Sequence, residues 1–384
     1  MTRWAPHSFK NQATEEGLSA DDVARFALQY ENAAKMGVAP LLSLMHLAQS
    51  CGVCYDFLRG CCERETHVRF RNRIVTPYRT FSINKRSGGK RFISVPSEDL
   101  MAAQDWIYRL ILKSQPCHAR AFAYQPGRSI ADCAAIHMGC RWLIKLDIAS
   151  FFESITEKQV YGVFLGIGYA PLVSLELARL CTRVDAVSKK RKEGPKWKVK
   201  RRTMLGKIPC YLQESLGYLP QGAPTSPALS NLVARKMDEA LDHVATDAGF
   251  EYSRYSDDMY FSSSLPTTTK SEALHLARRA SVVIASAGFD LNRSKTMIAG
   301  PGQRRLVLGL LVDGNRLRLS PEQRRRIEWH YRHCLVDPAK HAEKKEFRSI
   351  SGLKHHLGGL LAYARAVDSD FVTKLEATPI SWPV

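Results

Sequence analysis

Two neighbouring aspartates, Asp257 and Asp258, are the residues of this sequence that most clearly suggest chemistry. They lie within the stretch FEYSRYSDDMYFSSS at residues 250–264, in which aromatic or apolar residues alternate with serines. That alternation predicts two short strands joined by a tight turn. Two like charges at the tip of a hairpin repel each other and contribute nothing to folding. They are therefore either ordinary turn residues or part of a cation site.

A third acid, Asp147, follows the mostly apolar stretch RWLIKL, and the whole segment RWLIKLDIASFFESI predicts a strand followed by a helix. Taken alone, such an acid is more often a helix cap or half of an ion pair. Buried neighbouring carboxylates are costly, however, unless a cation neutralises them. Hard divalent ions such as Mg²⁺ prefer oxygen ligands and leave room for substrate phosphates. The three acids together predict a site for such ions.

Two divalent ions about 3.5–4 Å apart can clamp the attacking and the leaving oxygen of an in-line phosphoryl transfer. One ion lowers the pKa of a sugar hydroxyl, and the other neutralises the charge that develops on pyrophosphate. Because successive side chains of a strand point to opposite faces, we expect Asp257 to be the stronger direct ligand. Asp258 would support the site from the turn. The expected cofactor is Mg²⁺, as two ions, with Mn²⁺ as an alternative.

The composition favours a polyanionic partner. The 384 residues contain 56 Lys and Arg against 37 Asp and Glu, a net charge of +19, and the pI is near 9.6. A field of this size attracts nucleic acid first and an anionic membrane surface second. No apolar run approaches the roughly 20 residues that span a bilayer. The N-terminus, MTRWAPHSFKNQATEEG, has no apolar signal-peptide core, so a cytoplasmic protein is expected.

The cysteines raise the question of a metal site near the N-terminus. Cys51 and Cys54 form a C-x-x-C motif, and Cys61, Cys62 and His67 follow closely. The surrounding segment LLSLMHLAQSCGVCYDFLRGCCER has apolar residues spaced three and four apart, which predicts helix, turn, helix. In a cytoplasmic chain we expect these thiols to be reduced and packed, and not to bind metal.

The order of the predicted elements indicates an α+β fold with helices added at both ends. Residues 1–65 show amphipathic helical spacing, with Ser19 as a candidate N-cap. The stretch YRTFSINKRSGGKRFISVP then alternates like two strands joined across a Ser-Gly-Gly turn at residues 87–89. From Ser320 a basic helical region leads towards the C-terminus. The length suggests two or three domains.

A strongly basic stretch, KKRKEGPKWKVKRR at residues 189–202, contains nine basic residues and one acidic residue. The Gly-Pro pair within it predicts a surface loop. Many such loops are only solvated charge. The aromatic ring of Trp197 beside Lys196 favours a contact with nucleic acid.

Four blocks, in order, resemble the motifs of reverse transcriptases. KLDIASFF resembles their first catalytic aspartate motif, and YSDD resembles their Tyr-x-Asp-Asp motif. Between them, LPQGAPTSPALSNLV at residues 219–233 resembles the Leu-Pro-Gln-Gly-x-x-x-Ser-Pro block of bacterial reverse transcriptases. FDLNRSKTMI resembles the Leu-Asn-x-x-Lys block that follows. A lone Tyr-x-Asp-Asp is weak, but four blocks in the correct order and spacing are specific.

Two N-terminal stretches, APLLSLMHLAQSCGVCYDFL and YRTFSINKRSGGKRFISVP, resemble blocks of the retron branch. Retron reverse transcriptases copy part of a partner non-coding RNA into short single-stranded DNA. They typically start from a guanosine 2′-hydroxyl and leave a branched RNA–DNA product, msDNA. With separate effector proteins they serve antiphage defence. The resemblance implies that function here, with a structured RNA template and primer, its DNA product, dNTPs and an effector protein as partners.

Two retron motifs are altered in this sequence. The usual Asn-Ala-x-x-His reads CAAIH, with Cys133 in place of asparagine and His137 retained, and the usual Val-Thr-Gly reads VLG, with Leu308. Both changes remove hydrogen-bonding side chains, so RNA contacts through them would be lost or rebuilt. Two alternatives stay open: a different bacterial defence reverse transcriptase with another template or priming mode, and a chain that mainly acts as an RNA–DNA-binding scaffold restraining an effector.

The resemblance implies a right-hand polymerase with fingers, palm and thumb. A helical region is expected over residues 1–65 and the fingers over residues 66–140. The palm is expected over residues 141–314, with a basic insertion near 185–205, and the helical thumb over residues 315–384. The catalytic and metal-binding residues in this scheme are Asp147, Asp257 and Asp258.

By the same resemblance, several residues meet the incoming nucleotide. Lys90 and Arg91 would contact the triphosphate as charge-assisted donors. Phe152 would lie beneath the sugar and exclude a ribose 2′-hydroxyl, and Lys295 would interact with the pyrophosphate leaving group. The residues that position the nucleotide are Gln221 and Gly222, where glycine permits close approach of the backbone.

Contacts with the RNA–DNA duplex are expected from the thumb and from the basic loop. The segment RRRIEWHYRH would track the phosphate backbone, so that binding falls steeply with salt. An A-form or hybrid helix is recognised by shape and by sugar–phosphate contacts. The hairpin LVLGLLVDG would grip the primer end. The expected nucleic-acid-binding residues are His137, Lys196, Trp197, Arg324, Arg325, Arg326, Arg332 and His333.

Overall fold

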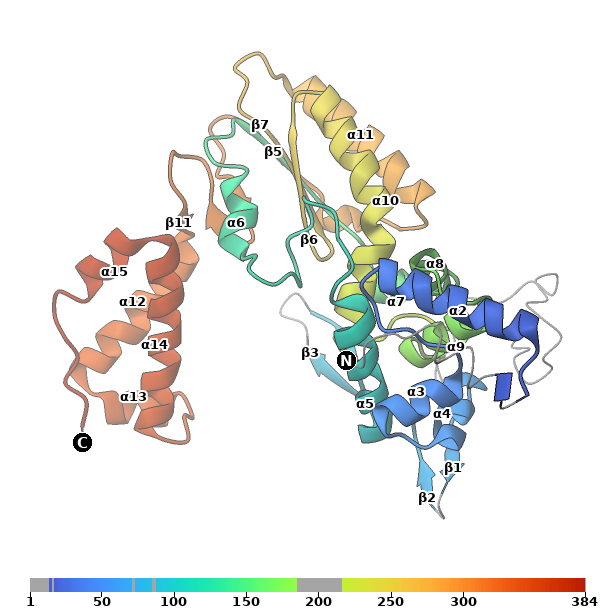
Figure 1. Cartoon of the computed structure of the whole chain (residues 1–384). Coiled ribbons are helices and arrows are strands. Elements are labelled where there is room, and N and C mark those ends of the chain that lie inside the picture. The colour runs from blue at the N-terminus through green and yellow to red at the C-terminus, as the bar shows by residue number, and fades with distance from the viewer. Residues whose placement is uncertain (1–13, 16, 71–72, 85–87, 185–215, 384) are drawn as a thin grey trace. The chain divides into compact units, whose positions relative to one another are not determined.

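A computed structural model describes residues 14–15, 17–70, 73–84, 88–184 and 216–383. The chain folds into two compact units (Figure 1). Unit 1 comprises Met1–His118 and Ala149–Lys236, and unit 2 comprises Ala119–Ile148 and Met237–Val384. Each unit is therefore built from two separate stretches of sequence. The predicted basic loop, with Lys196 and Trp197, lies outside the described residues.

Unit 1 combines helices with two small antiparallel sheets, β1-β2 and β3-β4. The seven-residue strands β3 and β4 pair from Tyr78↔Pro96 to Asn84↔Lys90, which confirms the predicted hairpin. The elements are α2 (Ala20–Lys35), α3 (Leu44–Cys51), α4 (Tyr55–Cys62), β1 (Val68–Phe70), β2 (Arg73–Val75), β3 (Tyr78–Asn84), β4 (Lys90–Pro96), α5 (Glu98–Ile107), the π-helix η1 (Tyr108–Leu112), α7 (Phe151–Ser154), α8 (Glu157–Ile167), α9 (Pro171–Cys181) and the start of α10 (Ser226–Asp247).

The N-terminal helices follow the sequence pattern closely. Ser19 caps α2, because its hydroxyl accepts a hydrogen bond from the Asp22 amide, as predicted. Helix α3 ends at Cys51 and is capped by Gly52, which has a φ of 70°, and after a short turn α4 begins at Tyr55, so the helix–turn–helix prediction is confirmed. Cys61 and Cys62 pack inside unit 1 as free thiols. Among the described residues no group of three or more His, Cys, Asp or Glu side chains forms a ready metal site.

A buried ion-pair cluster joins three segments of unit 1. Glu157, at the start of α8, accepts from Arg64 Nη2 at 2.6 Å and from Arg179 Nε at 3.0 Å. Burial alone raises the pKa of the Glu157 carboxyl, but the two guanidinium groups outweigh it and the pKa is lowered. Removing one member of such a cluster would leave a buried charge without its partner. The cluster therefore fixes the packing of α4, α8 and α9.

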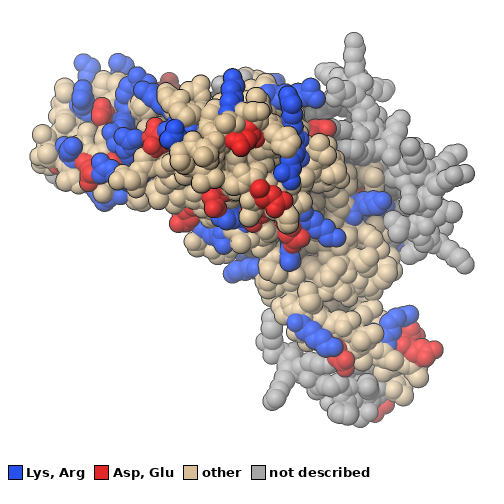
Figure 2. All heavy atoms as spheres, turned by 90° about the horizontal axis from the view of Figure 1, so that it is seen from above, with Lys and Arg blue, Asp and Glu red and all other residues tan. Residues whose placement is uncertain are grey.

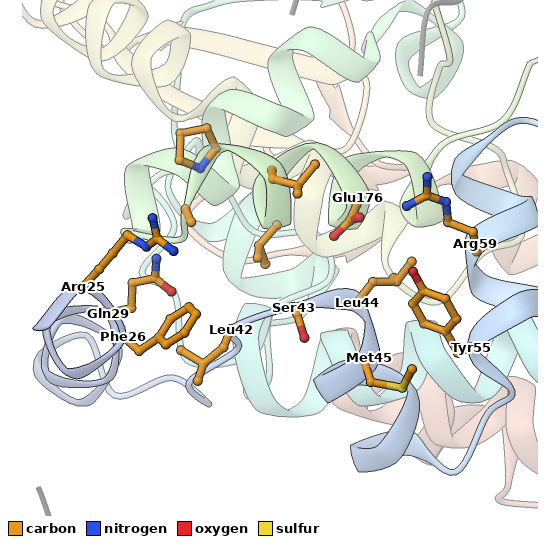
Figure 3. Close-up of a pocket in the computed structure, with 14 residues that line it drawn as sticks. Arg25, Phe26, Gln29, Leu42, Ser43, Leu44, Met45, Tyr55, Arg59 and Glu176 are labelled. Carbon is orange, nitrogen blue, oxygen red and sulfur yellow. The ribbon is translucent and has the colours of Figure 1, made fainter. Parts of the chain in front are cut away.

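Unit 1 also contains an open groove of about 740 Å³ between α2, α3, α4 and α9 (Figure 3). Its lining is largely apolar and includes Phe26, Leu42 and Met45. Arg25 and Arg59 lie towards its two ends in Figure 3. No residue predicted to act in catalysis or to bind nucleic acid lines this groove.

Unit 2 is organised around a four-stranded antiparallel sheet of order β6-β7-β5-β8, next to a small sheet of order β11-β10-β9. Figure 1 shows α10 and α11 running side by side along the larger sheet. The elements are α6 (Ile130–Ala135), β5 (Trp142–Asp147), the rest of α10, β6 (Glu251–Tyr255), β7 (Asp258–Ser263), α11 (Lys270–Ser286), the 3₁₀ turn η3 (Arg293–Lys295), β8 (Met297–Ala299), β9 (Leu306–Val307), β10 (Leu310–Leu311), β11 (Arg318–Leu319), α12 (Pro321–Val336), α13 (Pro338–Lys344), α14 (Ile350–Val367) and α15 (Ser369–Leu375).

One hydrophobic cluster links the sheets of unit 2 to its C-terminal helices. It contains Tyr260 of β7, Val307 of β9 and Leu353 of α14, each almost inaccessible to water. Ser320 caps α12 with a capping box, which confirms the predicted helix start. No helix among the described residues is both long and apolar enough to cross a membrane. The mixed helices and antiparallel sheets confirm the predicted α+β class.

Candidate active site

The three predicted catalytic aspartates all belong to unit 2, at one end of its larger sheet. Asp147 ends β5 and Asp258 begins β7, and the two are direct partners in the antiparallel register. Asp257 precedes Asp258 in the turn between β6 and β7, and its carbonyl accepts a hydrogen bond from the Ile148 amide at 3.0 Å. The sheet therefore brings together acids that are more than a hundred positions apart in the sequence.

A buried ion pair holds the turn that carries Asp257. Arg254 on β6 is inaccessible to water and forms a bidentate pair with Asp238 of α10, with both contacts at 2.7 Å. A further guanidinium nitrogen of Arg254 donates to the Ser256 carbonyl at 3.0 Å. Bidentate, charge-assisted bonds of this kind fix geometry as well as contributing energy. Arg254 therefore holds the first residue of the turn in place.

Ser256 itself adopts a left-handed backbone conformation, with a φ of 60°. Such a conformation is unfavourable for a residue with a side chain and persists only where the surroundings enforce it. The hydroxyl of Ser256 lies 2.9 Å from that of Tyr124, which adds a second fixed contact. The turn is thus rigidly positioned, and Asp257 with it.

Two lysines are paired with two of the three carboxylates. Lys295 Nζ donates to Asp147 Oδ2 at 2.8 Å, and Lys145 Nζ donates to Asp258 Oδ1 at 2.9 Å. Among the described residues, none donates a hydrogen bond to the Asp257 carboxylate or pairs with it. The site therefore contains one open carboxylate and two whose charge the chain itself offsets.

Burial and neighbouring charges shift the proton affinities in this site. Burial raises the pKa of Asp258, and the charges of Asp257 and Asp147 add to the rise against the lowering effect of Lys145. The hydrogen bond with Asp147 raises the pKa of Lys295, and the charges of Asp257 and Asp258 act in the same direction. These mutual effects place all three acids within electrostatic reach of Lys295.

The donor chemistry of this cluster fits a hard divalent cation. Carboxylate oxygens are the ligands that such ions prefer. The ammonium groups of Lys295 and Lys145 already offset part of the negative charge of these acids. In the parts of the chain that the structure describes, no three such side chains form a ready-made metal cage. Asp147 would have to exchange Lys295 for a metal ion, whereas Asp257 is already open.

Gln221 and Gly222 pack directly against the β4 strand of unit 1. The Gln221 carbonyl accepts from the Ser94 amide at 2.7 Å. Gly222 has a φ of 109°, and a Cβ there would lie 2.9 Å from Ile93 Cγ2 and 3.1 Å from the Ser94 carbonyl oxygen. Only glycine fits this position without displacing its neighbours. The Gln-Gly pair is therefore held against the middle of β4, the strand that begins with Lys90 and Arg91.

Lys90, Arg91 and Phe152, which are also predicted to meet the nucleotide, lie in unit 1 as well. Lys90 and Arg91 are exposed at the start of β4, opposite Asn84 and Ile83. Phe152 in α7 is only partly buried, and its ring lies 5.8 Å from that of the buried Phe151. The structure thus brings Gln221 and Gly222 to the Lys90–Arg91 hairpin, and Lys295 to the aspartates of unit 2.

Comparison with known proteins decides the family. Residues 83–312 match the family described as reverse transcriptase (RNA-dependent DNA polymerase). The chain is 32% identical to the retron Mx65 reverse transcriptase of Myxococcus xanthus, over 86% of this chain and 69% of that protein. This chain belongs to the retron reverse transcriptases. It is therefore an RNA-directed DNA polymerase, with an RNA template, a DNA product and a dependence on divalent metal.

Two further retron reverse transcriptases are similar to this chain. It is 32% identical to the retron Mx162 reverse transcriptase of Myxococcus xanthus, over 74% of this chain and 56% of that protein. It is 28% identical to the retron Ec86 reverse transcriptase of Escherichia coli, over 78% and 81%. Among solved structures, telomerase from Candida albicans in complex with a fragment of telomeric RNA matches with a TM-score of 0.42 and 13% identity, over 78% of this chain and 56% of that chain.

The structure corrects the role predicted for His137 in this retron reverse transcriptase. Its ring is inaccessible to water, with Nδ1 2.7 Å from the Ser262 hydroxyl and Nε2 2.6 Å from the Ser253 hydroxyl. Burial lowers its pKa to about 3, so the ring is neutral. Because no ring atom reaches the surface, the prediction that His137 contacts nucleic acid is wrong. The residue instead ties the chain after α6 to strands β6 and β7.

The thumb residues predicted to contact nucleic acid lie on α12. Some of them are exposed, and others are paired with neighbouring groups of the chain. Arg325, Arg326 and Arg332 are exposed. Arg324 pairs with Asp368 and lies over the Phe371 ring, and His333 Nδ1 donates to the Trp329 carbonyl at 2.8 Å. Figure 2 shows many Lys and Arg side chains, with fewer Asp and Glu among them, at the left end of the view, over α12–α15. A basic surface is thus present on this part of the reverse transcriptase.

Sequence reasoning missed several residues that shape the site of this reverse transcriptase. Lys145 precedes Asp147 by two positions, and strand alternation alone puts both side chains on one face, so this signal was present. The pair of Arg254 and Asp238 had no such signal, because its members lie on different elements. Tyr260 reads in sequence as an ordinary core aromatic of β7.

Proposed function

We propose that this retron reverse transcriptase copies part of a structured non-coding RNA into short single-stranded DNA, the branched RNA–DNA product msDNA. The observation that carries the proposal is the register of β5 with β7, which sets Asp147 opposite Asp258 with Asp257 in the adjoining turn. That arrangement gathers oxygen ligands where a primer hydroxyl and a nucleotide triphosphate could meet. The retron relatives support the choice of product.

We propose that Asp147 and Asp257 would hold Mg²⁺, as two ions with Mn²⁺ as an alternative, with Asp258 supporting them. When bound, such ions activate the primer hydroxyl and neutralise the charge that develops on pyrophosphate. Lys295, whose side chain is 48% exposed, would then be free to donate to the pyrophosphate leaving group. The rigid turn at Ser256 keeps the open Asp257 carboxylate in place throughout.

Nucleotide selection is proposed for residues of unit 1. The exposed pair Lys90 and Arg91 would bind the triphosphate, and Gln221 with Gly222 would position the base and sugar. Phe152 would exclude a ribose 2′-hydroxyl by steric contact and so select deoxynucleotides. The packing of Gly222 on Ile93 and Ser94 supports this grouping, because it joins two of these segments into one piece.

The partners proposed are the structured RNA, its DNA product, dNTPs and a separate effector protein that serves antiphage defence. Lys196, Trp197 and the thumb residues Arg324, Arg325, Arg326, Arg332 and His333 would contact the nucleic acid. The exposed arginines of α12 support this surface, and contacts with phosphate make its binding depend on salt. The location proposed is the reducing cytoplasm, where the described cysteines would stay free thiols.

Replacement of Asp257 by Asn tests the proposed metal site. The variant keeps the shape of the turn but removes the open carboxylate, so we expect metal-dependent DNA synthesis to be lost. RNA binding, measured by gel shift, should stay at the wild-type level. Asp247→Asn, at the exposed end of α10, is the matched control and should synthesise DNA normally. Substantial synthesis by the Asp257 variant would refute the role.

The product itself tests the proposed synthesis of branched msDNA. The protein would be purified from its native locus and its bound nucleic acid sequenced, with and without treatment by an enzyme that cleaves 2′ branches. A short DNA joined to a structured RNA through a 2′-hydroxyl is the expected result. Long or untemplated DNA would favour another template or priming mode, for which the altered Cys133 and Leu308 are the relevant sequence changes.

A further inference from the structure

Tyr260 of β7 connects a catalytic aspartate to a distant turn. Its ring is inaccessible to water, yet its hydroxyl has two polar neighbours. The hydroxyl accepts from the Leu308 amide at 3.2 Å and faces Asp258 Oδ2 at 3.4 Å. Because one hydroxyl can donate and accept at once, Tyr260 can serve both groups. This side chain has no role in the proposed reaction.

The turn that Tyr260 reaches is conformationally strained. Strands β9 and β10 pair as Val307↔Leu310, so Leu308 and Gly309 form a two-residue turn. Their φ values are 51° and 86°. A two-residue hairpin with positive φ at both positions normally carries Asn, Asp or Gly first, and leucine is unfavourable there. A bond to the Leu308 amide therefore helps to hold a conformation that the residue does not prefer.

Asp258 is held from its other side as well. Lys145 Nζ lies 2.9 Å from Asp258 Oδ1 and 5.5 Å from the centre of the Tyr260 ring. The two carboxylate oxygens thus face different protein donors, the ammonium on one side and the hydroxyl on the other. This leaves Asp258 with little freedom to rotate.

Both altered retron motifs meet around this tyrosine. His137 of CAAIH lies with its ring centre 6.0 Å from that of Tyr260, and Cys133 Sγ lies 3.3 Å from the Ser253 hydroxyl that His137 also contacts. Leu308 of VLG is on the other side, at the Tyr260 hydroxyl. The CAAIH and VLG motifs are far apart in the chain, but both therefore lie around Tyr260, the residue whose hydroxyl faces Asp258.

We propose that Tyr260 is a positioning residue, which couples the Leu308–Gly309 turn to Asp258 through its hydroxyl. The coupling rests on the proposed function, in which Asp258 supports the metal ions and the β9–β10 hairpin grips the primer end. A primer held in the correct place would thereby favour the correct orientation of the carboxylate. Tyr260 touches neither the substrate nor the metal ions in this scheme.

The test compares Tyr260→Phe with Tyr169→Phe. Tyr169 is the control, because its side chain is also buried and its hydroxyl donates to the Ala39 carbonyl at 2.6 Å, in unit 1, which contains none of the three aspartates. Two quantities would be measured on the full chain with a primed RNA template. One is the affinity for Mn²⁺, from the electron paramagnetic resonance of free Mn²⁺, and the other is the rate of single-turnover nucleotide addition.

We expect Tyr260→Phe to weaken Mn²⁺ binding and to slow nucleotide addition by up to about tenfold, the scale of one lost hydrogen bond. The distance of 3.4 Å between the Tyr260 hydroxyl and Asp258 Oδ2 is long for a hydrogen bond between two oxygens, so we expect no larger effect than this. Tyr169→Phe should change neither quantity, even if it lowers the melting temperature as much. A loss of stability alone, equal in both variants, would mean that Tyr260 is only structural and would overturn the proposal.

Asp258→Asn separates this proposal from the function on which it rests. If Asp258→Asn loses Mn²⁺ binding and activity while Tyr260→Phe behaves like the wild type, only the coupling through Tyr260 is overturned. If both variants behave like the wild type, the proposed role of Asp258 is overturned as well. Loss in both, with Tyr169→Phe unaffected, supports the coupling.

Discussion

Asp147 and Asp258 lie directly opposite each other on the antiparallel strands β5 and β7, and each is paired with its own lysine. Opposite residues on neighbouring strands have Cα atoms about 4.5–5.5 Å apart, and like charges in that position are destabilising. Lys295 and Lys145 offset this repulsion with positive charge from the chain itself. The acids can therefore be gathered during folding before any metal ion is bound.

Replacing Lys295 by Met should separate metal binding from catalysis. The ammonium competes for Asp147, so its removal should leave Mn²⁺ affinity unchanged or stronger. Nucleotide addition should nevertheless slow by about tenfold to a hundredfold, the range of a lost hydrogen bond to a charged group, because the leaving group loses its donor. Titration with Mn²⁺ and single-turnover kinetics would measure the two effects. Lys270→Met, at the exposed start of α11, is the control, and weaker Mn²⁺ binding with normal catalysis would contradict the prediction.

Replacing Gly222 by Ala should disturb the nucleotide-positioning loop of unit 1. The new Cβ would lie 2.9 Å from Ile93 Cγ2, at a φ of 109° that a side chain disfavours. We expect a loss of about 1–3 kcal/mol in the free energy of unfolding, and a higher KM for dNTPs. Urea unfolding and steady-state kinetics would measure both.

Gly166→Ala is the matched control for the loop variant. Gly166 lies on the exposed face of α8, and an added Cβ there meets no atom within 4 Å. Alanine should therefore stabilise this helix by up to about 1 kcal/mol without changing the KM. Equal effects of the two substitutions would show that the close packing at Gly222 has no role in nucleotide binding.

Replacing Phe152 by Ala should weaken discrimination between deoxynucleotides and ribonucleotides. The ring is only partly buried in α7, so it is available to contact a sugar, and its neighbour Phe151 supplies the buried anchor. We expect the ratio of kcat/KM for dNTP over rNTP to fall, mainly through improved use of rNTPs. Primer extension with each nucleotide would measure this ratio. An unchanged ratio, in a variant that still folds, would remove the role assigned to Phe152.

Local pattern was enough to predict the elements that carry the acids. Alternation of apolar and polar residues predicted the hairpin around Asp257 and Asp258, and the apolar run before Asp147 predicted β5. These features depend on neighbours within a few positions, which the sequence displays directly. The resemblance to reverse transcriptases then predicted that the two segments form one site. The register of β5 with β7, which sets Asp147 opposite Asp258, agrees with that prediction.

The supporting contacts could not be predicted, because they join residues that only tertiary packing brings together. Asp238 and Arg254 are sixteen positions apart on a helix and a strand, and Tyr260 and Leu308 are forty-eight positions apart. Leucine at a positive φ gives no turn signal, since turns of that kind favour glycine or asparagine. Burial of His137 likewise depends on which strands pack over α6, and a lone histidine does not reveal that.

Replacing His137 by Gln should change how stability depends on pH. Burial lowers the pKa of the folded His137 to about 3, below the 6.5 of an unfolded histidine. As the pH falls, the unfolded chain therefore binds a proton at this histidine before the folded chain does. The free energy of unfolding that is present above pH 6.5 is then lost progressively between pH 6.5 and 3, at up to roughly 1.4 kcal/mol for each pH unit. The glutamine variant cannot titrate. It should be less stable than the wild type at pH 7.5, and the difference should shrink at pH 5.

Urea unfolding at pH 7.5 and pH 5 would measure this difference. His275→Gln, on the exposed surface of α11, is the control and should stay within about 0.5 kcal/mol of the wild type at both pH values. A difference between His137→Gln and the wild type that is the same at both pH values would mean that the unfolded chain gains no proton at His137 relative to the folded one. The neutral ring between Ser253 and Ser262 would then not be the state that the fold requires.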